Sequence, residues 1–260
     1  MTDLRYDESK TDRKHLMQAL ADACACRLGT PVLETGKTGE LSLRAKAERR
    51  YAIACAHAGS PRDGEISGDT FVSFEGEGDL FYALLSDGMG SGREAAVASG
   101  ITGAYLSGVL SAGLGCEAAL RSLNRMLTAR GSECSVTVDL LSVDLLSGRA
   151  AFIKSGAAVS YVRRGDSLFR IRATTLPVGI LPLPDAEKTE FDLQAGDVIV
   201  MLSDGISTSP DDVFWLCELL TSGWEGDLSH MAERILAAAR RENSPGDDMT
   251  VALLSVKEAP

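Results

Sequence analysis

The chain has 260 residues, of which 45% are hydrophobic and 24% are charged, so it can bury a sizeable core. Its 37 acidic residues outnumber its 26 basic residues and give a formal net charge of −11. This balance excludes nucleic acid as an expected partner, because phosphate backbones are bound by clustered Lys and Arg side chains.

The cysteines and the N-terminus indicate the compartment. Six cysteines are present, and Cys24 and Cys26 form a C-x-C pair that matches no zinc-binding spacing. The first residues are polar and charged, unlike a signal peptide. No apolar run approaches the roughly 20 residues that cross a bilayer. We therefore expect reduced thiols, no membrane segment in this chain and a cytoplasmic location.

The first third of the chain changes from helical to strand periodicity. Leu16 and Leu20 lie on one apolar face and predict a helix over residues 14–27. Residues 58–69 are rich in Gly, Pro, Ser and Asp, which predicts a loop. Alternating apolar residues predict strands at 41–43, 51–55, 71–74 and 80–86, the last two forming a hairpin.

The remaining elements come as pairs of helices between groups of strands. Helices are predicted at about 93–111, 116–130, 211–222 and 228–242. Short strands are predicted at 135–144, 149–154, 159–164, 167–172, 197–203 and 249–255. Because strands and helices do not alternate strictly, this order indicates an α+β layered fold rather than a parallel doubly wound sheet.

Four aspartates share a position at the end of a predicted strand: Asp69, Asp87, Asp204 and Asp247. Asp87 and Asp204 each follow an apolar strand in a Ser-Asp-Gly sequence. Carboxylates that converge repel one another, and hard divalent cations such as Mg²⁺ and Mn²⁺ would offset that repulsion. The alternative is that each Asp-Gly pair only forms a turn. Four such aspartates, each at a strand end, favour a two-metal site.

Six segments taken together are similar to one family. They resemble, in order, the phosphatase domain of stage II sporulation protein E, within the metal-dependent protein phosphatase 2C-like (PPM) family. The resemblance runs from about residue 45 to residue 256. The segments are S-G-D-T-F (67–71), L-L-S-D-G-M-G-S-G-R-E-A (84–95), the strand pair 138–158, L-P-V-G-I-L (176–181), A-G-D-V-I-V-M-L-S-D-G-I (195–206) and G-D-D-M-T-V (246–251).

The resemblance implies a four-layer α-β-β-α sandwich, in which two antiparallel sheets are flanked by helices. Residues 41–260 would form this phosphatase domain, and residues 1–40 would form an N-terminal helical or regulatory segment. That segment is also a candidate dimerising element, so a homodimer is an expected assembly. Relatives of this kind carry a membrane region, so the chain could derive from a membrane-anchored full-length protein.

The resemblance also implies the site chemistry, with two Mn²⁺ or Mg²⁺ ions between the sheet edges. A metal-bound hydroxide would attack phosphorus in line, without a protein nucleophile. Asp87 would bridge both ions, and Asp69 would act directly or through metal-bound water, which makes these two the catalytic residues. The full set of expected metal ligands is Asp69, Asp87, the Gly88 carbonyl, Asp204 and Asp247. Asp248 stands where relatives often carry Asn and is a weaker candidate ligand.

The expected activity is that of a protein-serine/threonine phosphatase in sporulation and sigma factor regulation, acting on phosphoserine in a small anti-anti-sigma factor. Two alternatives stay open: a pseudophosphatase that only binds a phosphoprotein, and a hydrolase of small phosphoesters. Arg62 is a candidate for holding the substrate phosphate, and Glu133 is a candidate ligand of a third metal. The three histidines are scattered, and none lies in a motif.

Overall fold

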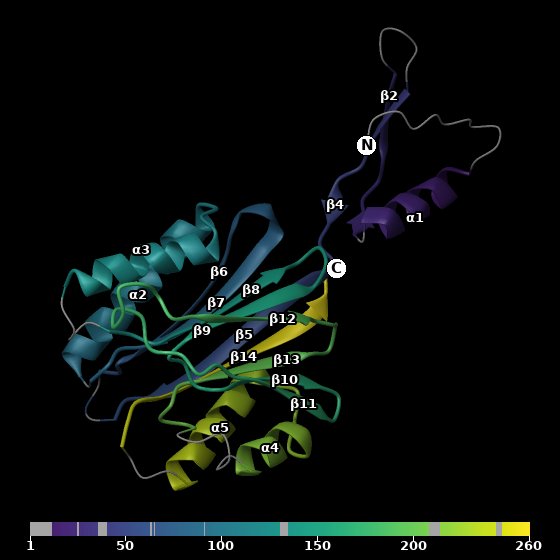
Figure 1. Ribbon diagram of the computed structural model, residues 1–260. Helices are drawn as coiled ribbons and strands as arrows, with labels where there is room; N and C mark the ends of the chain where they lie inside the picture. The colour runs from purple at the N-terminus through teal and green to yellow at the C-terminus, as the bar shows by residue number, and fades with distance from the viewer. Residues whose placement is uncertain are drawn as a thin grey trace.

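The computed structural model describes residues 12–24, 26–35, 41–62, 64, 66–90, 92–130, 135–207, 214–242 and 246–260. Two five-stranded antiparallel sheets face each other, and helices cover their outer faces (Figure 1). This is the four-layer α-β-β-α arrangement that the family resemblance implies, and it confirms the α+β prediction.

The first sheet has the strand order β12-β9-β8-β7-β6. Helices α2 (Arg93–Ser111) and α3 (Cys116–Thr128) pack on its outer face through Leu106, Leu120 and Leu123. These leucines recur at helical spacing, so each helix turns one apolar side to the sheet. Its strands are β6 (Asp69–Glu75), β7 (Leu80–Asp87), β8 (Val138–Asp144), β9 (Arg149–Ser155) and β12 (Glu187–Asp192).

The second sheet has the strand order β11-β10-β13-β14-β5. Helices α4 (Phe214–Thr221) and α5 (Leu228–Glu242) cover its outer face through Leu216, Met231 and Ile235. Its strands are β5 (Tyr51–Ser60), β10 (Ser160–Arg164), β11 (Ser167–Ile171), β13 (Val198–Leu202) and β14 (Met249–Glu258).

A third apolar layer fills the space between the sheets. Alternate residues of each strand point inward, including Leu85 and Phe152 from the first sheet and Ile199 and Leu254 from the second. The other residues of the same strands face the helices. Strand β7 is therefore buried on both faces, and its end, where Asp87 lies, is held firmly.

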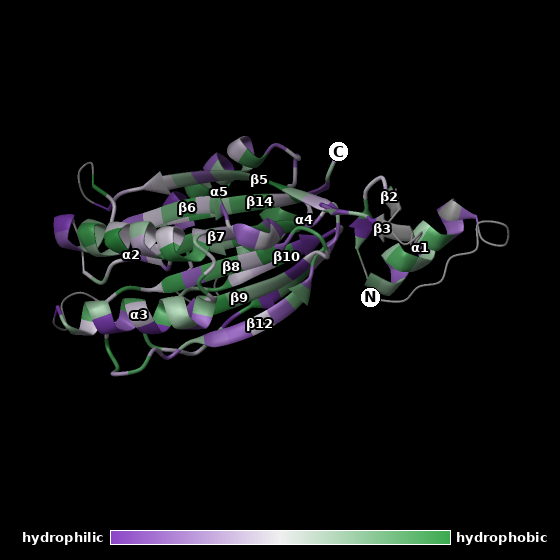
Figure 2. Ribbon diagram, turned by 90° about the horizontal axis from the view of Figure 1, so that it is seen from above, coloured by the Kyte–Doolittle hydropathy of each residue, from purple (hydrophilic) through white to green (hydrophobic). Residues whose placement is uncertain are grey.

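The N-terminal part projects beyond one end of the sandwich in both ribbon views (Figures 1 and 2). It contains α1 (Arg13–Cys24) and two short strand pairs, β1 (Arg27–Leu28) with β4 (Ala47–Glu48) and β2 (Val32–Thr35) with β3 (Leu41–Arg44). Where the chain enters the sandwich, Arg49 donates hydrogen bonds to Glu75 and to Asp79 of the 3-10 turn Glu77–Asp79. The expected boundary at residues 40 and 41 falls inside the β2–β3 pair.

Most predicted elements are present, and the differences have physical causes. The predicted loop at 58–69 is wrong at both ends, because β5 runs to Ser60 and β6 begins at Asp69. Strand β12 was not predicted, since it is a polar edge strand that pairs only with β9. Among the described helices, none is long and apolar enough to cross a membrane.

Candidate active site

The four predicted aspartates lie at the same end of the sandwich. Asp69 begins β6 and Asp87 ends β7, and the two residues are directly paired across these strands. Asp204 follows β13 and Asp247 precedes β14, two strands that pair antiparallel. Because paired antiparallel strands bring the end of one beside the start of the other, each sheet contributes two carboxylates to the cluster.

Thr137 fixes the backbone of Asp87. The Asp87 N–H donates to Thr137 Oγ1 at 3.0 Å, and the Thr137 N–H donates to the Asp87 carbonyl at 2.8 Å. Next along the chain, Gly88 passes so close to α2 that an added Cβ would lie 2.2 Å from the Ala95 carbonyl oxygen. Only glycine fits there, so the Ser-Asp-Gly sequence reflects a close approach of two backbones as well as a turn.

Asp248, the weaker candidate metal ligand, has a carboxylate that already accepts hydrogen bonds from the protein backbone. Its Oδ1 accepts the Arg62 N–H and its Oδ2 accepts the Gly68 N–H, both at 2.6 Å. Its side chain is buried, and two charge-assisted hydrogen bonds of this kind are strong. Asp248 therefore holds the segment that leads into Asp69.

The electrostatics of the cluster favour a bound cation. Burial, with repulsion from the neighbouring carboxylates, raises the pKa of Asp87 to about 8. Burial also raises the pKa of Asp69 to about 6, and the nearby hydroxyls of Thr250 and Ser203 offset part of this effect. Asp204 is exposed as a whole residue, but partial burial of its carboxyl group and the charge of Asp247 raise its pKa.

Asp69 is the least satisfied carboxylate of the cluster among the residues that the structure describes. Both of its carboxylate oxygens are buried, and neither has a well-formed hydrogen bond. The atoms available to bind a metal ion are carboxylate and carbonyl oxygens, which suit Mg²⁺ and Mn²⁺. Across the described residues, however, no three His, Cys, Asp or Glu side chains stand close enough to hold an ion. Mg²⁺ usually keeps several waters and binds proteins through one or two carboxylates, so water would complete the coordination of an ion here.

The other predicted candidates lie outside this cluster or outside the described residues. Arg62 is exposed, and its backbone N–H donates to Asp248 beside the cluster. Glu133 lies outside the described residues. His15 and His230 are exposed on α1 and α5, and His57 packs on Phe71 at a ring distance of 5.2 Å.

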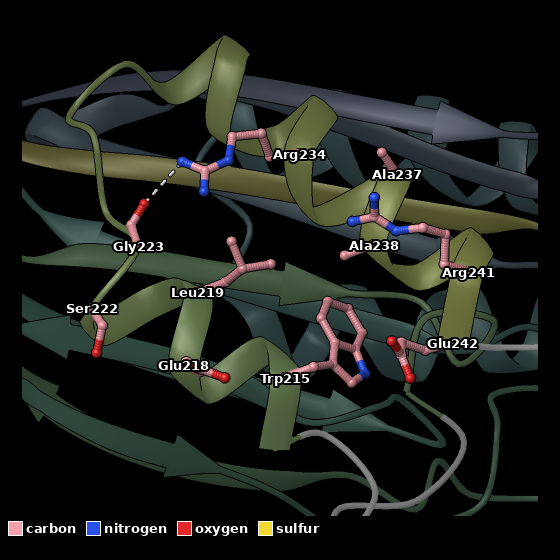
Figure 3. Close-up of a pocket in the computed structure, with 10 residues that line it drawn as sticks. All are labelled: Trp215, Glu218, Leu219, Ser222, Gly223, Arg234, Ala237, Ala238, Arg241 and Glu242. Carbon is pink, nitrogen blue, oxygen red and sulfur yellow. Dashed lines mark hydrogen bonds between the residues drawn. The ribbon is translucent and has the colours of Figure 1, made fainter.

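Asp87, Thr137 and Asp204 line a small space of about 10 Å³ at the aspartate cluster. A larger groove of about 660 Å³ lies between α4 and α5 and is lined by Trp215, Leu219 and Arg241 among others (Figure 3). Arg234 spans one end of this groove and donates to the Gly223 carbonyl at 3.0 Å. The groove lies in the helical layer and contains none of the predicted site residues.

Comparison with known proteins decides the family. The model of the stage II sporulation protein E family matches residues 77–257. The chain belongs to this family. It is 31% identical over 214 residues to stage II sporulation protein E of Bacillus subtilis (strain 168) and 30% identical over 209 residues to that of Priestia megaterium. These matches cover 80% and 78% of the chain but only 26% and 36% of the two relatives, so the chain spans about a third of their length or less.

Solved structures with a similar fold include a member of this family. The PP2C phosphatase domain of B. subtilis stage II sporulation protein E, solved with a fragment of its regulatory domain, superposes with a TM-score of 0.77 at 26% identity. That match covers 98% of this chain and 76% of the solved one. RsbX, solved in complex with magnesium, is similar in fold, with a TM-score of 0.61 at 14% identity over 88% of this chain and 100% of its own. The sandwich is thus a domain of the PP2C protein-serine/threonine phosphatase type.

The site also contains residues that the sequence reasoning missed. Thr137 hydrogen-bonds the Asp87 backbone. Asp139 and Lys154 form a buried ion pair, and Asp139 lines the small space that Asp87 and Asp204 also line. A signal was present, because Asp139 and Lys154 interrupt otherwise apolar strands. Charged residues are almost never fully buried unless they are paired, so such interruptions indicate a buried ion pair.

Proposed function

We propose that the chain is a metal-dependent phosphatase that removes phosphate from a phosphoserine of a small regulatory protein. The observation that carries the proposal is the gathering of four aspartates at one end of the sandwich, with both carboxylate oxygens of Asp69 buried and without a well-formed hydrogen bond. Family membership adds independent support, since the B. subtilis relative contains a PP2C phosphatase domain.

Two divalent cations, Mn²⁺ or Mg²⁺, are the proposed cofactors. When bound, such ions supply an activated water and neutralise charge on the phosphoryl group. Magnesium in the RsbX structure supports this assignment for the fold. The proposed ligands are Asp69, Asp87, the Gly88 carbonyl, Asp204 and Asp247, with Asp69 and Asp87 as the catalytic pair.

The chain's own residues would position the reacting groups. Thr137 keeps the Asp87 backbone in place, and Asp248 keeps the segment before Asp69 in place. Asp204 is exposed, so we propose that the substrate phosphate enters on its side of the cluster. Preorganisation of this kind contributes to catalysis because the groups need not rearrange during the reaction.

The shape of the site favours a protein substrate over a small phosphoester. Sites for small molecules usually enclose roughly 300–1,000 Å³. Among the described residues, the space lined by Asp87 and Asp204 holds about 10 Å³, too small by itself to bury such a ligand. A phosphoserine on a protein needs no enclosed pocket, because the protein surface supplies the remaining contacts. We propose an anti-anti-sigma factor as the substrate, in sporulation control, and a homodimer formed through the N-terminal part.

The test compares phosphate release from a protein substrate and from a small phosphoester, in the presence and absence of metal. The protein is incubated with a phosphoserine-bearing anti-anti-sigma factor and, separately, with p-nitrophenyl phosphate, each with Mn²⁺ and with EDTA. We expect Mn²⁺-dependent phosphate release, faster from the protein substrate. Binding of the phosphoprotein without release would indicate a pseudophosphatase, and faster release from the small ester would indicate a phosphoesterase; either result contradicts the proposal.

A further inference from the structure

A buried ion pair lies in the apolar layer between the sheets. Asp139 of β8 and Lys154 of β9 are directly paired across these strands, and Lys154 Nζ lies 2.6 Å from Asp139 Oδ2. Their side chains are 2% and 1% exposed, respectively. Burial lowers the pKa of Lys154, and the charge and hydrogen bond of Asp139 oppose that change. Desolvation makes such a pair costly, so it is weak evidence for a purely stabilising role.

The hydrogen bonds of the pair leave one atom without a partner. Besides Asp139, Lys154 Nζ donates to the Ala158 carbonyl at 2.6 Å and to Ser160 Oγ at 2.9 Å, so its three N–H groups are all used. Ser160 Oγ donates to Asp139 Oδ2 at 2.5 Å. Asp139 Oδ1 is buried and has no hydrogen-bond partner. Such an acceptor is costly to bury, so a donor at Oδ1 would be strongly favoured.

The unpartnered carboxylate belongs to a residue that lines the small space at the aspartate cluster. Asp139, Thr137, Asp87 and Asp204 all line this space of about 10 Å³. A volume near this size holds one water molecule when several polar groups surround it. Thr137 precedes Asp139 by two residues on the same segment, and it is the residue that clamps the Asp87 backbone. The ion pair is thus linked to Asp87 in two ways: Thr137, two residues before Asp139, hydrogen-bonds the Asp87 backbone, and Asp139 and Asp87 line the same small space.

We propose that Asp139 and Lys154 are positioning residues for Asp87. Asp139 Oδ1 accepts a hydrogen bond from a water molecule in this space, and that water together with Thr137 holds Asp87 toward the cations. Lys154 fixes the Asp139 carboxylate, and through Ala158 and Ser160 it connects the arrangement to the second sheet. This inference rests on the proposed function, because it assigns a support to the proposed metal ligand.

The decisive variant replaces both charges in the full chain, as Asp139→Leu with Lys154→Met. Replacing a buried pair by apolar residues of similar volume is often neutral for stability, so the fold is expected to persist. If the pair positions Asp87, Mn²⁺ affinity measured by calorimetry should fall about 10- to 100-fold, as for other residues behind metal ligands. Amide hydrogen exchange at Asp87 should also accelerate in the metal-free protein.

A second ion pair, in which the carboxylate is buried and the arginine is 30% exposed, provides the control. Arg164 Nη2 lies 2.7 Å from Asp197 Oδ2, and the Asp197 side chain is 1% exposed. Asp197 precedes β13 and Asp204 follows it, so the two ends are about 23 Å apart. The corresponding variant, Arg164→Met with Asp197→Leu, should keep wild-type Mn²⁺ affinity and wild-type exchange at Asp87.

The outcomes separate this inference from the proposed function. Failure of the wild-type protein to bind Mn²⁺ would overturn both. Wild-type Mn²⁺ binding, with equal affinity and equal Asp87 exchange in the Asp139 and Lys154 double variant, would overturn only the positioning role. If the double variant does not fold, Asp139→Asn is measured in the same way. A metal-free crystal structure should show a water within hydrogen-bond distance of Asp139 Oδ1, and its absence at high resolution would also overturn the inference.

Discussion

The metal-free protein should lose stability as the pH rises from 5 to 8. Burial and neighbouring carboxylates raise the pKa of Asp87 to about 8 and burial raises that of Asp69 to about 6. In the unfolded chain both groups ionise near their ordinary pKa of about 4. Between these values the folded protein retains protons that the unfolded chain has released, so the free energy of unfolding falls with rising pH.

The size of the loss follows from the two shifts. For each proton that the folded protein retains and the unfolded chain has released, the free energy of unfolding falls by about 1.4 kcal/mol for every unit by which the pH rises. From pH 5 to 7, Asp87 contributes about 3 kcal/mol and Asp69 adds about 1 kcal/mol below its own pKa, a sum of about 4 kcal/mol. Above pH 8 the curve should level off, because both groups are then ionised in both states.

Urea unfolding in EDTA at pH 5, 6, 7 and 8 measures this dependence. The matched variant Asp87→Asn cannot titrate at this position, so it should retain only the smaller slope from Asp69 and Asp204 and should be more stable than wild type at pH 8. Saturating Mn²⁺ should remove or reverse the slope, because cations displace the retained protons. A metal-free stability that is flat or rises over this range, or an unchanged slope in Asp87→Asn, would refute the reasoning.

Further predictions concern packing and thiol chemistry. Gly88→Ala should destabilise the protein in urea by about 1–3 kcal/mol, because the new Cβ would overlap the α2 backbone at Ala95; unchanged stability would contradict this. Gly100→Ala on the same helix meets open space and should instead stabilise by about 0.5–1 kcal/mol. Burial raises the pKa of the Cys55 and Cys116 thiols, so iodoacetamide should leave turnover intact. Rapid inactivation that substrate prevents would instead indicate a catalytic thiol.

Local sequence pattern predicted an α+β layered fold and placed the aspartates at strand ends, whereas the four-layer sandwich was implied by the family resemblance. Helix α2 begins and ends where its small-residue pattern does, and β7 ends at the Ser-Asp-Gly turn. Strand β12 was not predicted because an edge strand needs little apolar surface, and because its pairing with β9 depends on the tertiary fold. Its residues alone do not distinguish it from a loop.

The supporting residues of the site were harder to predict than its central ones. Asp248 holds Arg62 and Gly68 across about 180 residues of chain, a contact that no local pattern encodes. The pairing of Asp139 with Lys154 depends on the β8–β9 register, which fixes which residues lie opposite each other. Charged residues within apolar strands signal that such partners exist, but the fold decides which residues pair.

The most direct measurement of the central claim is Mn²⁺-dependent phosphate release from a phosphoserine protein by wild type and Asp87→Asn. Removing the proposed bridging carboxylate should cost about 3 kcal/mol of transition-state stabilisation or more, which is a rate loss of at least about 100-fold. Circular dichroism and urea unfolding establish that the variant is folded. Near-normal turnover of folded Asp87→Asn at saturating Mn²⁺ would contradict the account.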